Sequence, residues 1–427
     1  MTPKDKAVAS PEIDALYDEI CPLAERFAKA GFSFYLVGGI VRNHLAGSSV
    51  DLDDRVGFVD LDDIDITTDA QPAEIKALVT DWFEALWTQG ERFGTIGGRR
   101  GSRVFEITTH RAESYAPDSR KPEVVFSTAL IDDLSRRDFT VNAMAWTVPE
   151  RELIDPFDGQ SDLVAKRLRT PLDPEVSFTD DPLRMLRAAR FLTRFDLEAD
   201  AALLAAVERL AGRLEIVSAE RVRDELHKLL RLADPTIGLR YLADTGLLAQ
   251  FWPELNQTGI ERIRSVRADP LARIAAAMIG SDDDVVVNRV RELRHSNSDV
   301  RHIRSLVGAA TTWKRVRSPL SDELIRRFAL RTRGSFAELV DIAIAVGLPC
   351  ASEVEASVSR LREAGDLDDL GPELTGEEVM RLLDVGPGPW VGEVLAELSE
   401  YRLAGGRHDS ADLEAKVRRY WASRPVR

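Results

Sequence analysis

The sequence predicts an α+β fold, in which a mixed head of strands and helices precedes an all-helical remainder. Strand patterns occur at 34–39, 63–68 and 103–110, with helical patterns between them. From about residue 180 onward, apolar residues recur at helical spacing and strand patterns nearly vanish. Strands followed by a run of helices are typical of an α+β head on a helical body.

The head begins with a short apolar run, FYLVGG (34–39), that predicts a strand ending in two glycines. The next segment, IVRNHLAG (40–47), predicts a short helix that Gly47 closes. Residues 48–62 are rich in aspartate and predict an acidic loop inserted before the next strand. In DIDITT (63–68), polar and apolar residues alternate, which is the period of a half-buried strand.

Further along the head, PAEIKALVTDWFEALW predicts a helix over 72–87, and RVFEITTH (103–110) is rich in the β-branched and aromatic residues of strands. Three later segments predict helices: DPLRMLRAARFLTRF, AERVRDELHKLLRLA and VRHIRSLVGAATTWKRV.

The composition limits the class of protein. A chain of 427 residues suggests about three domains, and 44% hydrophobic with 30% charged residues is a globular composition. The net charge of −15 argues against a protein that coats nucleic acid non-specifically, although a local basic surface remains compatible with it. Two cysteines, Cys21 and Cys350, cannot build a disulfide framework or a zinc ribbon. No signal peptide or membrane-spanning run is present, so we expect a cytoplasmic protein.

Asp63 and Asp65 are the first candidates for a chemical role. Residues two apart on a strand point to the same face, so both carboxylates can converge while Ile64 and Ile66 anchor the other face. Two converging carboxylates attract magnesium, which also binds phosphates. The same Asp-x-Asp pattern occurs at 51–53 and 60–62 without a strand to fix its geometry. A solvated acidic loop is the alternative for each pattern.

Gly38 and Gly39 lie between the first strand and its helix. Glycines there let backbone N–H groups approach a phosphate closely, and Arg42 one turn later can add a charge-assisted hydrogen bond. The alternative is a tight turn without a ligand.

The segment SRRDFTVNA (135–143) places Arg137, Asp138 and Asn142 close together with Arg136. If the segment is helical, Asp138 and Asn142 are four residues apart and share a face. The alternative is an ordinary charged helix start.

In DDPLRMLRAARF (180–191), Asp181 before Pro182 predicts a helix start, with aspartate as the cap and proline in the first helical position. The arginines of this helix recur at steps of three, namely Arg184, Arg187 and Arg190. An aspartate beside an arginine can offer an acceptor and a donor to a base edge, while further arginines hold phosphates. The alternatives are a simple cap and a solvated face.

The stretch 295–333 contains nine basic and three acidic residues in an otherwise acidic chain. Such a patch could contact RNA phosphates without reading sequence. The candidate RNA-binding residues are Arg301, Arg304, Lys314, Arg315 and Arg317. Intramolecular ion pairs are the alternative role for these arginines.

Taken together, the motifs resemble those of class II tRNA nucleotidyltransferases, the CCA-adding enzymes that share ancestry with bacterial poly(A) polymerases. The matching segments are LVGG-x-VR (36–42), DIDITT (63–68), RRDFTVNA (136–143), DDPLRMLRAARF (180–191) and SAERVRDEL (218–226). The resemblance spans about residues 34–226, half of the chain. It implies a polymerase β-like nucleotidyltransferase head at 10–165, a helical neck with a nucleotide-template motif at 166–255, and a helical body and tail at 256–427 that binds tRNA.

The resemblance also implies roles for single residues. Asp63 and Asp65 would hold two Mg2+ ions, with Glu106 as a third carboxylate. Asp181 and Arg184 would read the Watson–Crick edge of CTP or ATP. The other residues implied in nucleotide binding are Gly38, Gly39, Arg42, Arg137, Asp138, Asn142, Arg187 and Arg190.

This sequence departs from the family pattern at three places. Asn43 stands where the family has aspartate, which would weaken an interaction with Arg42. Asp180 stands where the family has glutamate, and the 48–62 insertion enlarges the loop before the metal strand. None of these changes removes a core catalytic group.

The expected function is therefore the template-independent addition of C, C and A to the 3′ end of tRNA, with release of pyrophosphate. The alternatives are an enzyme that adds only CC or only A, a poly(A) polymerase, and a non-catalytic RNA-binding scaffold. No protein partner is evident. The dipeptide His408-Asp409 lacks the further ligands of a phosphohydrolase and is interpreted as a loop before a helix.

Overall fold

The structure is a computed structural model that describes residues 11–49, 63–114, 123–317 and 319–423. The chain divides into two compact units, Met1–Pro253 and Glu254–Arg427, and each is described by itself. Most of the acidic insertion, including both additional Asp-x-Asp patterns, lies outside the described residues. Among the helices that the structure describes, none combines the length and the apolar character that a membrane crossing requires.

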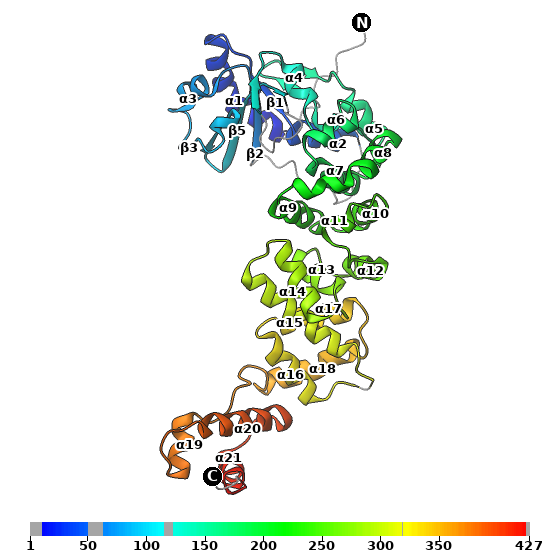
Figure 1. Ribbon diagram of the computed structural model, residues 1–427. Coiled ribbons are helices and arrows are strands. Elements are labelled where there is room, and N and C mark those ends of the chain that lie inside the picture. Colours follow the sequence, from blue (N-terminus) through cyan, green and yellow to red (C-terminus); the bar gives the residue numbers. More distant parts are fainter. Residues whose placement is uncertain (1–10, 50–62, 115–122, 318, 424–427) are drawn as a thin grey trace. The chain divides into compact units, whose positions relative to one another are not determined.

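A mixed seven-stranded sheet forms the centre of the first unit, with strand order β3-β4-β5-β2-β1-β8-β9 (Figure 1). Its strands are β1 (Tyr35–Val37), β2 (Asp63–Thr68), β3 (Ala85–Trp87), β4 (Thr95–Arg100), β5 (Arg103–Thr109), β8 (Ala145–Thr147) and β9 (Leu153–Ile154). The central strands β2 and β5 run parallel, whereas the other neighbours are antiparallel. Two small ribbons pair β6 (Arg111–Ser114) with β7 (Glu123–Phe126) and β10 (Arg167–Leu168) with β11 (Glu198–Ala199).

Helices flank this sheet and then continue without it. They are α1 (Pro11–Lys29), α2 (Gly39–Ser49), α3 (Pro72–Val79), α4 (Leu130–Ser135), α5 (Gly159–Val164), α6 (Pro174–Asp180), α7 (Leu183–Phe195), α8 (Ala201–Leu210), α9 (Ala219–Leu230), α10 (Thr236–Asp244) and α11 (Leu248–Phe251). Short 3-10 turns occur at Glu91–Phe93, Thr140–Asn142 and Ala211–Ile216. The α+β class and the three strands predicted from the sequence are confirmed.

Two helices of the head end at other residues than predicted. The helix expected over 72–87 ends at Val79, and residues 85–87 form β3, which pairs with β4. The buried rings of Trp82 and Phe83 pack on Phe105 of β5. The apolar residues after Val79 therefore pack against the sheet and do not form one face of a longer helix. Gly47 does not close α2, because the helix continues to Ser49.

The alternation of β2 separates the core from the site. Ile64 and Ile66 are 0% and 1% exposed and belong to the core, together with Phe105 and Ile107 of β5. Residues of opposite parity point to the other face of a strand. The sheet therefore holds one apolar face against the helices and presents polar residues of β2 and β5 on the other.

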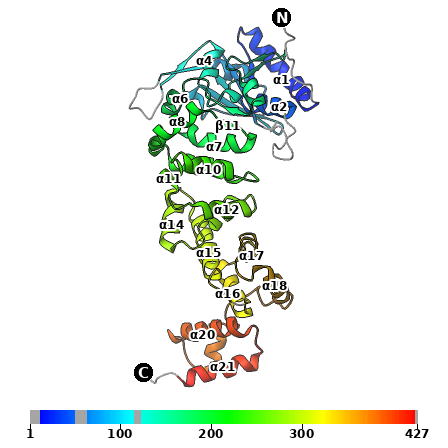
Figure 2. The same ribbon diagram turned by 90° about the vertical axis from the view of Figure 1, so that its right-hand side faces the viewer.

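The second unit is helical throughout its described residues. Its helices are α12 (Gln257–Ser265), α13 (Pro270–Ala277), α14 (Asp283–Glu292), α15 (Asn297–Trp313), α16 (Asp322–Thr332), α17 (Phe336–Ala345), α18 (Val354–Glu363), α19 (Gly376–Leu383), α20 (Trp390–Gly405) and α21 (Ser410–Ala422). Figure 2 shows α20 and α21 side by side, and they share an apolar cluster that includes Val394, Leu398, Leu413 and Val417.

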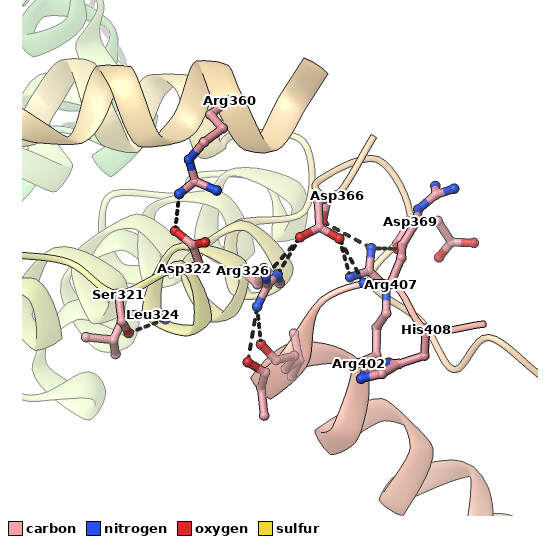
Figure 3. A network of polar contacts seen from close by, with 12 residues as sticks. Ser321, Asp322, Leu324, Arg326, Arg360, Asp366, Asp369, Arg402, Arg407 and His408 are labelled. Atoms are coloured by element: carbon pink, nitrogen blue, oxygen red, sulfur yellow. Dashed lines mark hydrogen bonds and ion pairs between the residues drawn. The ribbon is translucent and has the colours of Figure 1, made fainter. Parts of the chain in front are cut away.

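One buried carboxylate joins α16 to the end of α20 (Figure 3). Asp366 accepts hydrogen bonds from Arg326 at 2.9 Å and from Arg402 at 2.6 Å, and all three side chains are buried. Arg326 also donates to the carbonyl of Leu403 at the last turn of α20. Cations at a helix C-terminus are favourable, so this contact fixes the two helices together.

Candidate active site

Three carboxylates share the polar face of the central strands. In the parallel pair β2 and β5, Asp65 lies opposite Glu106, and Asp63 lies two residues before Asp65. Burial raises the pKa of Asp65 to about 6, with the charges of Asp63 and Glu106 acting in the same direction. Partial burial, followed by the charge of Asp63, also raises the pKa of Glu106. The protein thus concentrates negative charge that a cation would relieve.

Gly38 lies directly against this carboxylate group. It follows β1 with a left-handed φ of +72°, and a Cβ added there would lie 2.8 Å from Asp65 Oδ2. Only glycine adopts this conformation readily and leaves this space. Gly39 then begins α2, so the helix starts directly after the glycine that approaches Asp65.

Arg42 is buried on the next turn of α2. Its Nε and Nη2 donate to Asn43 Oδ1 at 3.1 Å and 2.7 Å, and its Nη1 donates to Asn142 Oδ1. The guanidinium also lies 4.5 Å from the ring centroid of Phe195. Burial, followed by the charge of Arg194, lowers the pKa of Arg42 to about 9.

The segment 135–143 is not an α-helix, so Asp138 and Asn142 do not share a helix face. The chain leaves α4 at Ser135 and forms only the 3-10 turn Thr140–Asn142, because Phe139 and Val141 turn into the core and are fully buried. Asn142 Nδ2 nevertheless donates to Asp138 Oδ1 at 2.8 Å, so the two predicted partners do meet.

Arginines hold the two acidic residues of this region. Arg187 Nε donates to Asp138 Oδ2 at 2.8 Å, and burial, which raises the pKa of Asp138, is outweighed by Arg187 and Asn142, so that this pKa lies far below its ordinary value. Arg137 Nη2 donates to buried Asp133 Oδ2 at 3.1 Å. Burial would raise the pKa of Asp133 as well, but Arg137 and Arg136 lower it overall.

The start of α7 also differs from the prediction. The helix begins at Leu183 with Pro182 as its N-cap, one residue later than expected. Asp181 Oδ1 accepts from the backbone N–H of Leu183 at 3.2 Å, and Asp181 Oδ2 accepts from Arg221 Nη2 of α9 at 2.9 Å. Asp181 therefore accepts the N–H of the first residue of α7 and also pairs with Arg221.

The arginines of α7 are anchored individually. Arg184 is buried and donates to Ser177 Oγ at 2.8 Å and to the backbone carbonyl of Arg136. Arg190 Nε donates to Glu225 Oε2 of α9 at 3.0 Å. The side chains are thus fixed in position rather than spread over a solvated face.

These groups border one cavity of about 570 Å³ in the first unit. Of the residues predicted for catalysis or nucleotide binding, the cavity is lined by Gly38, Gly39, Arg42, Asp65, Glu106, Arg137, Asp138, Asn142, Asp181, Arg184, Arg187 and Arg190. Asp63 is exposed at the start of β2 and is not among the lining residues. The lining also includes Arg111, Arg136 and Arg221, so cations outnumber carboxylates there.

Three contributors were missed in the sequence. Arg221 and Glu225 lie four residues apart in SAERVRDEL, a segment to which no role was given, and both reach residues of α7 or its cap. Asp133 lies four residues before Arg137 and holds it. The spacing of four between Asp133 and Arg137 was a local signal, whereas the contacts of Arg221 and Glu225 join segments distant in the sequence.

Only some of the candidate RNA-binding residues lie together in the structure. Arg301 and Arg304 of α15 line a cleft of about 540 Å³ in the second unit, together with Arg331 of α16. Lys314, Arg315 and Arg317 are exposed after α15 and do not line it. Arg326 and Arg327 of the same stretch form intramolecular ion pairs, as the alternative interpretation proposed.

The carboxylate group fits a divalent metal in its chemistry. Asp63, Asp65 and Glu106 offer the oxygen ligands that magnesium prefers; burial and, to a lesser degree, the charges of Asp63 and Glu106 raise the pKa of Asp65, and a bound cation would oppose these effects. Within the described ranges, however, no three His, Cys, Asp or Glu side chains already stand in a finished ligand arrangement.

Comparison with known proteins identifies the family of the chain. Residues 34–169 match the Poly A polymerase head domain, and residues 196–258 match a domain described as the probable RNA and SrmB-binding site of polymerase A. A CCA-adding enzyme of Leuconostoc citreum is 30% identical over 404 residues, which cover 91% of this chain and 93% of that protein.

Two solved structures share the fold. A Bacillus stearothermophilus CCA-adding enzyme in complex with CTP aligns with a TM-score of 0.74 at 24% identity, covering 97% of this chain and 99% of the other. A Thermotoga maritima CCA-adding enzyme complexed with tRNA(CCA) aligns with a TM-score of 0.66 at 23% identity, covering 97% and 96%.

The mixed sheet, its carboxylates and the cationic cavity beside them define a nucleotidyltransferase. More narrowly, the chain belongs to the tRNA nucleotidyltransferase family, which includes the CCA-adding enzymes.

Proposed function

We propose that this protein adds C, C and A to the 3′ end of tRNA, using CTP and ATP and releasing pyrophosphate. One observation supports this most strongly: a single cavity contains carboxylates for metal binding, arginines for phosphates and the pair Asp181 and Arg184 for a base. The relative from Leuconostoc citreum is a CCA-adding enzyme, and the structural neighbours contain CTP or tRNA. A cytoplasmic location stays a prediction.

The carboxylates provide the reacting end of the site. Nucleotidyltransferases of this family use divalent metal ions. Two Mg2+ ions held by Asp63 and Asp65, with Glu106 as a third carboxylate, would activate the attacking 3′-hydroxyl and neutralise charge on the leaving pyrophosphate. Gly38 keeps the space beside Asp65 open, so that the α-phosphate can approach the carboxylates.

The arginines and backbone groups hold the triphosphate. Helix α2 starts at Gly39, and the backbone N–H groups of a helix start bind anions favourably. Arg42 and Arg137 border the same cavity, and Arg187 and Arg190 approach it from α7. Because Asp133, Asp138 and Glu225 fix three of these guanidinium groups, the phosphate site is ordered before the nucleotide arrives.

Base selection follows from hydrogen-bond patterns. Cytosine and adenine both present an amino donor beside a ring-nitrogen acceptor, whereas uracil and guanine reverse the pattern. The carboxylate of Asp181 accepts from the amino group, and the guanidinium of Arg184 donates to the ring nitrogen. One pair of side chains therefore admits CTP and ATP and rejects UTP and GTP, without a nucleic-acid template.

We assign the tRNA contacts to the second unit. Arg301 and Arg331 are exposed at its cleft, and Arg304 shares an exposed ion pair with Asp283 that RNA phosphates can replace. Such contacts would fix the position of the tRNA without reading its sequence. With the catalytic head at 10–165 and the neck at 166–255, this gives the proposed three-part organisation.

The deciding experiment is incorporation of radiolabelled CTP and ATP into three tRNAs that end in the discriminator base, in C or in CC. The proposed function requires magnesium-dependent completion of CCA on all three. Extension of only some ends would instead identify a CC-adding or A-adding enzyme, and long A tails would identify a poly(A) polymerase. Absence of incorporation on every end, with tRNA still bound, would identify a non-catalytic scaffold.

A further inference from the structure

Arg42 is a buried charge whose contacts are neutral. Its side chain belongs to a residue that is 6% exposed, and its three hydrogen bonds go to the amide oxygens of Asn43 and Asn142. In the described part of the chain, we find no carboxylate paired with it. A buried charge without an opposite charge is costly, so this position favours an anion.

The charged residues around Arg42 make an anion at this position still more favourable. Arg194, Arg190 and Arg187 act on it as like charges and, with burial, lower its pKa. Asp138 acts in the opposite direction, but Asn142 lies between it and Arg42, and Arg187 already pairs with its carboxylate. Asp65 also attracts the charge of Arg42, but the hydrogen bonds of the guanidinium go to Asn43 and Asn142, so Arg42 has no direct ion-pair partner in the described part of the chain.

The same charge borders the place where phosphates would lie. Arg42 lines the cavity with Gly38 and Gly39, and a Cβ at Gly39 would lie 3.4 Å from Arg42 Nη2. A phosphate that approaches the glycine turn and the start of α2 thus meets this guanidinium at short range. At such distances Coulomb's law predicts that a unit charge changes the dissociation constant of an anion by about tenfold or more, even in a partly screened site.

We propose that Asn43 sets the affinity of the site for polyphosphate, because its neutral amide positions Arg42 without cancelling its charge. The inference rests on the proposed function and extends it to a residue at which this sequence departs from the family's aspartate. A carboxylate at position 43 would occupy the same two guanidinium N–H groups and form an ion pair. The pair would then satisfy Arg42 internally and reduce its attraction for the nucleotide.

The test is calorimetric binding of pyrophosphate and of CTP in EDTA, so that no metal contributes. For Asn43→Asp we expect about tenfold weaker binding of both ligands, with a melting temperature equal to or above that of the wild type. Asn43→Ala removes the acceptor without adding charge, and we expect a lower melting temperature but pyrophosphate affinity within about threefold of the wild type. Asn297→Asp, an exposed residue of the second unit, adds the same charge elsewhere and should leave binding unchanged.

Unchanged pyrophosphate binding in Asn43→Asp would overturn the proposal, as would equal weakening in the Asp and Ala variants, which would assign Asn43 a purely geometric role. If Asn43→Asp does not fold, Arg42→Gln replaces it: tenfold weaker pyrophosphate binding supports the proposal, and wild-type binding overturns it. Because calorimetry requires no turnover, failure of CCA addition in the wild type would overturn the proposed function while leaving this result readable.

Discussion

Arg221 Nη2 donates a 2.9 Å hydrogen bond to Asp181 Oδ2, so the carboxylate that we assign to base reading already has a cationic partner before a nucleotide binds. The other oxygen, Oδ1, accepts from Leu183 N. Arg184 is likewise engaged, by Ser177 and the carbonyl of Arg136. The reading pair is therefore held in place by neighbouring helices, and a base must share or displace these contacts.

Replacing Asp181 by alanine should reduce nucleotide selection. We expect discrimination against UTP and GTP to fall by about 1–3 kcal/mol, or roughly 5- to 150-fold, with little change in tRNA affinity. Arg184→Ala should act similarly, whereas Arg187→Ala should mainly raise the KM for both nucleotides. Primer-extension rates with each of the four nucleotides measure this. Wild-type selectivity combined with a lower melting temperature in Asp181→Ala would leave Asp181 as a helix cap only.

Arg221→Ala tests whether the ion pair between Arg221 and Asp181 contributes to base selection. The ion pair is partly exposed, so we expect its loss to change the free energy of unfolding by less than about 1 kcal/mol. Selectivity should lie between those of the wild type and Asp181→Ala, since the acceptor remains but is held less firmly. The same four-nucleotide assay decides it, and full selectivity in Arg221→Ala would show that the contact is incidental to base reading.

Asp63→Ala and Asp65→Ala should each reduce incorporation by about a thousandfold or more, because metal-assisted phosphoryl transfer supplies several kcal/mol. Binding of tRNA, measured by filter retention, should stay within about twofold, since we assign it to phosphate contacts of the second unit. The double variant Asp51→Ala/Asp53→Ala is the control and should remain active. Strong magnesium-dependent activity in both single variants would move the metal site elsewhere.

Gly38→Ala tests the space beside Asp65. We expect a cost of about 1–2 kcal/mol in unfolding free energy from the left-handed φ, and a larger loss of activity because the new Cβ meets Asp65 Oδ2. Gly47→Ala is the matched control: a Cβ there meets nothing within 4 Å, and inside a helix it should be neutral or stabilising by up to about 1 kcal/mol. Thermal melting and incorporation rates give both values. Equal activity of the two variants would contradict the proposed approach of the α-phosphate at Gly38.

Asp366→Asn should destabilise the second unit by about 3–5 kcal/mol at pH 7, because two buried arginines lose their carboxylate. Burial would raise the pKa of Asp366, but hydrogen bonds from Arg326 and Arg402 lower it overall. A lowered pKa in the folded state adds stability above the ordinary aspartate pKa, and this is lost as the pH falls through the lowered value. The difference between wild type and variant should therefore shrink below about pH 4.

Denaturant unfolding across this pH range measures the effect. The exposed pair Asp322 and Arg360, also shown in Figure 3, supplies the control, since Asp322→Asn should cost less than about 1 kcal/mol. A constant difference between wild type and Asp366→Asn down to about pH 3 would exclude the charge as its cause.

The sequence alone predicts local contacts well and contacts between distant segments poorly. The alternation of DIDITT placed Asp63 and Asp65 on the face opposite Ile64, because period two is a property of any strand. The strand β3 was missed, because its pairing with β4 involves a segment that lies later in the chain. The packing of Trp82 and Phe83 on Phe105 is also a contact between distant segments, and periodicity within one segment does not reveal it.

The site shows the same limit. The steps of three along α7 predicted that its arginines would act together, but not that Glu225 of α9 would hold Arg190. A shared helix face for Asp138 and Asn142 required a helical segment, whereas the chain forms a short 3-10 turn there and buries Phe139. Contacts between distant segments, such as Arg221 with Asp181, follow from tertiary packing and were beyond pattern reasoning.

Every residue that lines the catalytic cavity precedes Pro253, whereas the basic cleft is built entirely after Glu254. Under the proposed function, choice of monomer and choice of acceptor strand are encoded in separate stretches of the gene. Substitutions in the later stretch can change which RNA is held while the set of added nucleotides stays the same. The proposed function therefore predicts that the second unit can be exchanged without changing which nucleotides are incorporated.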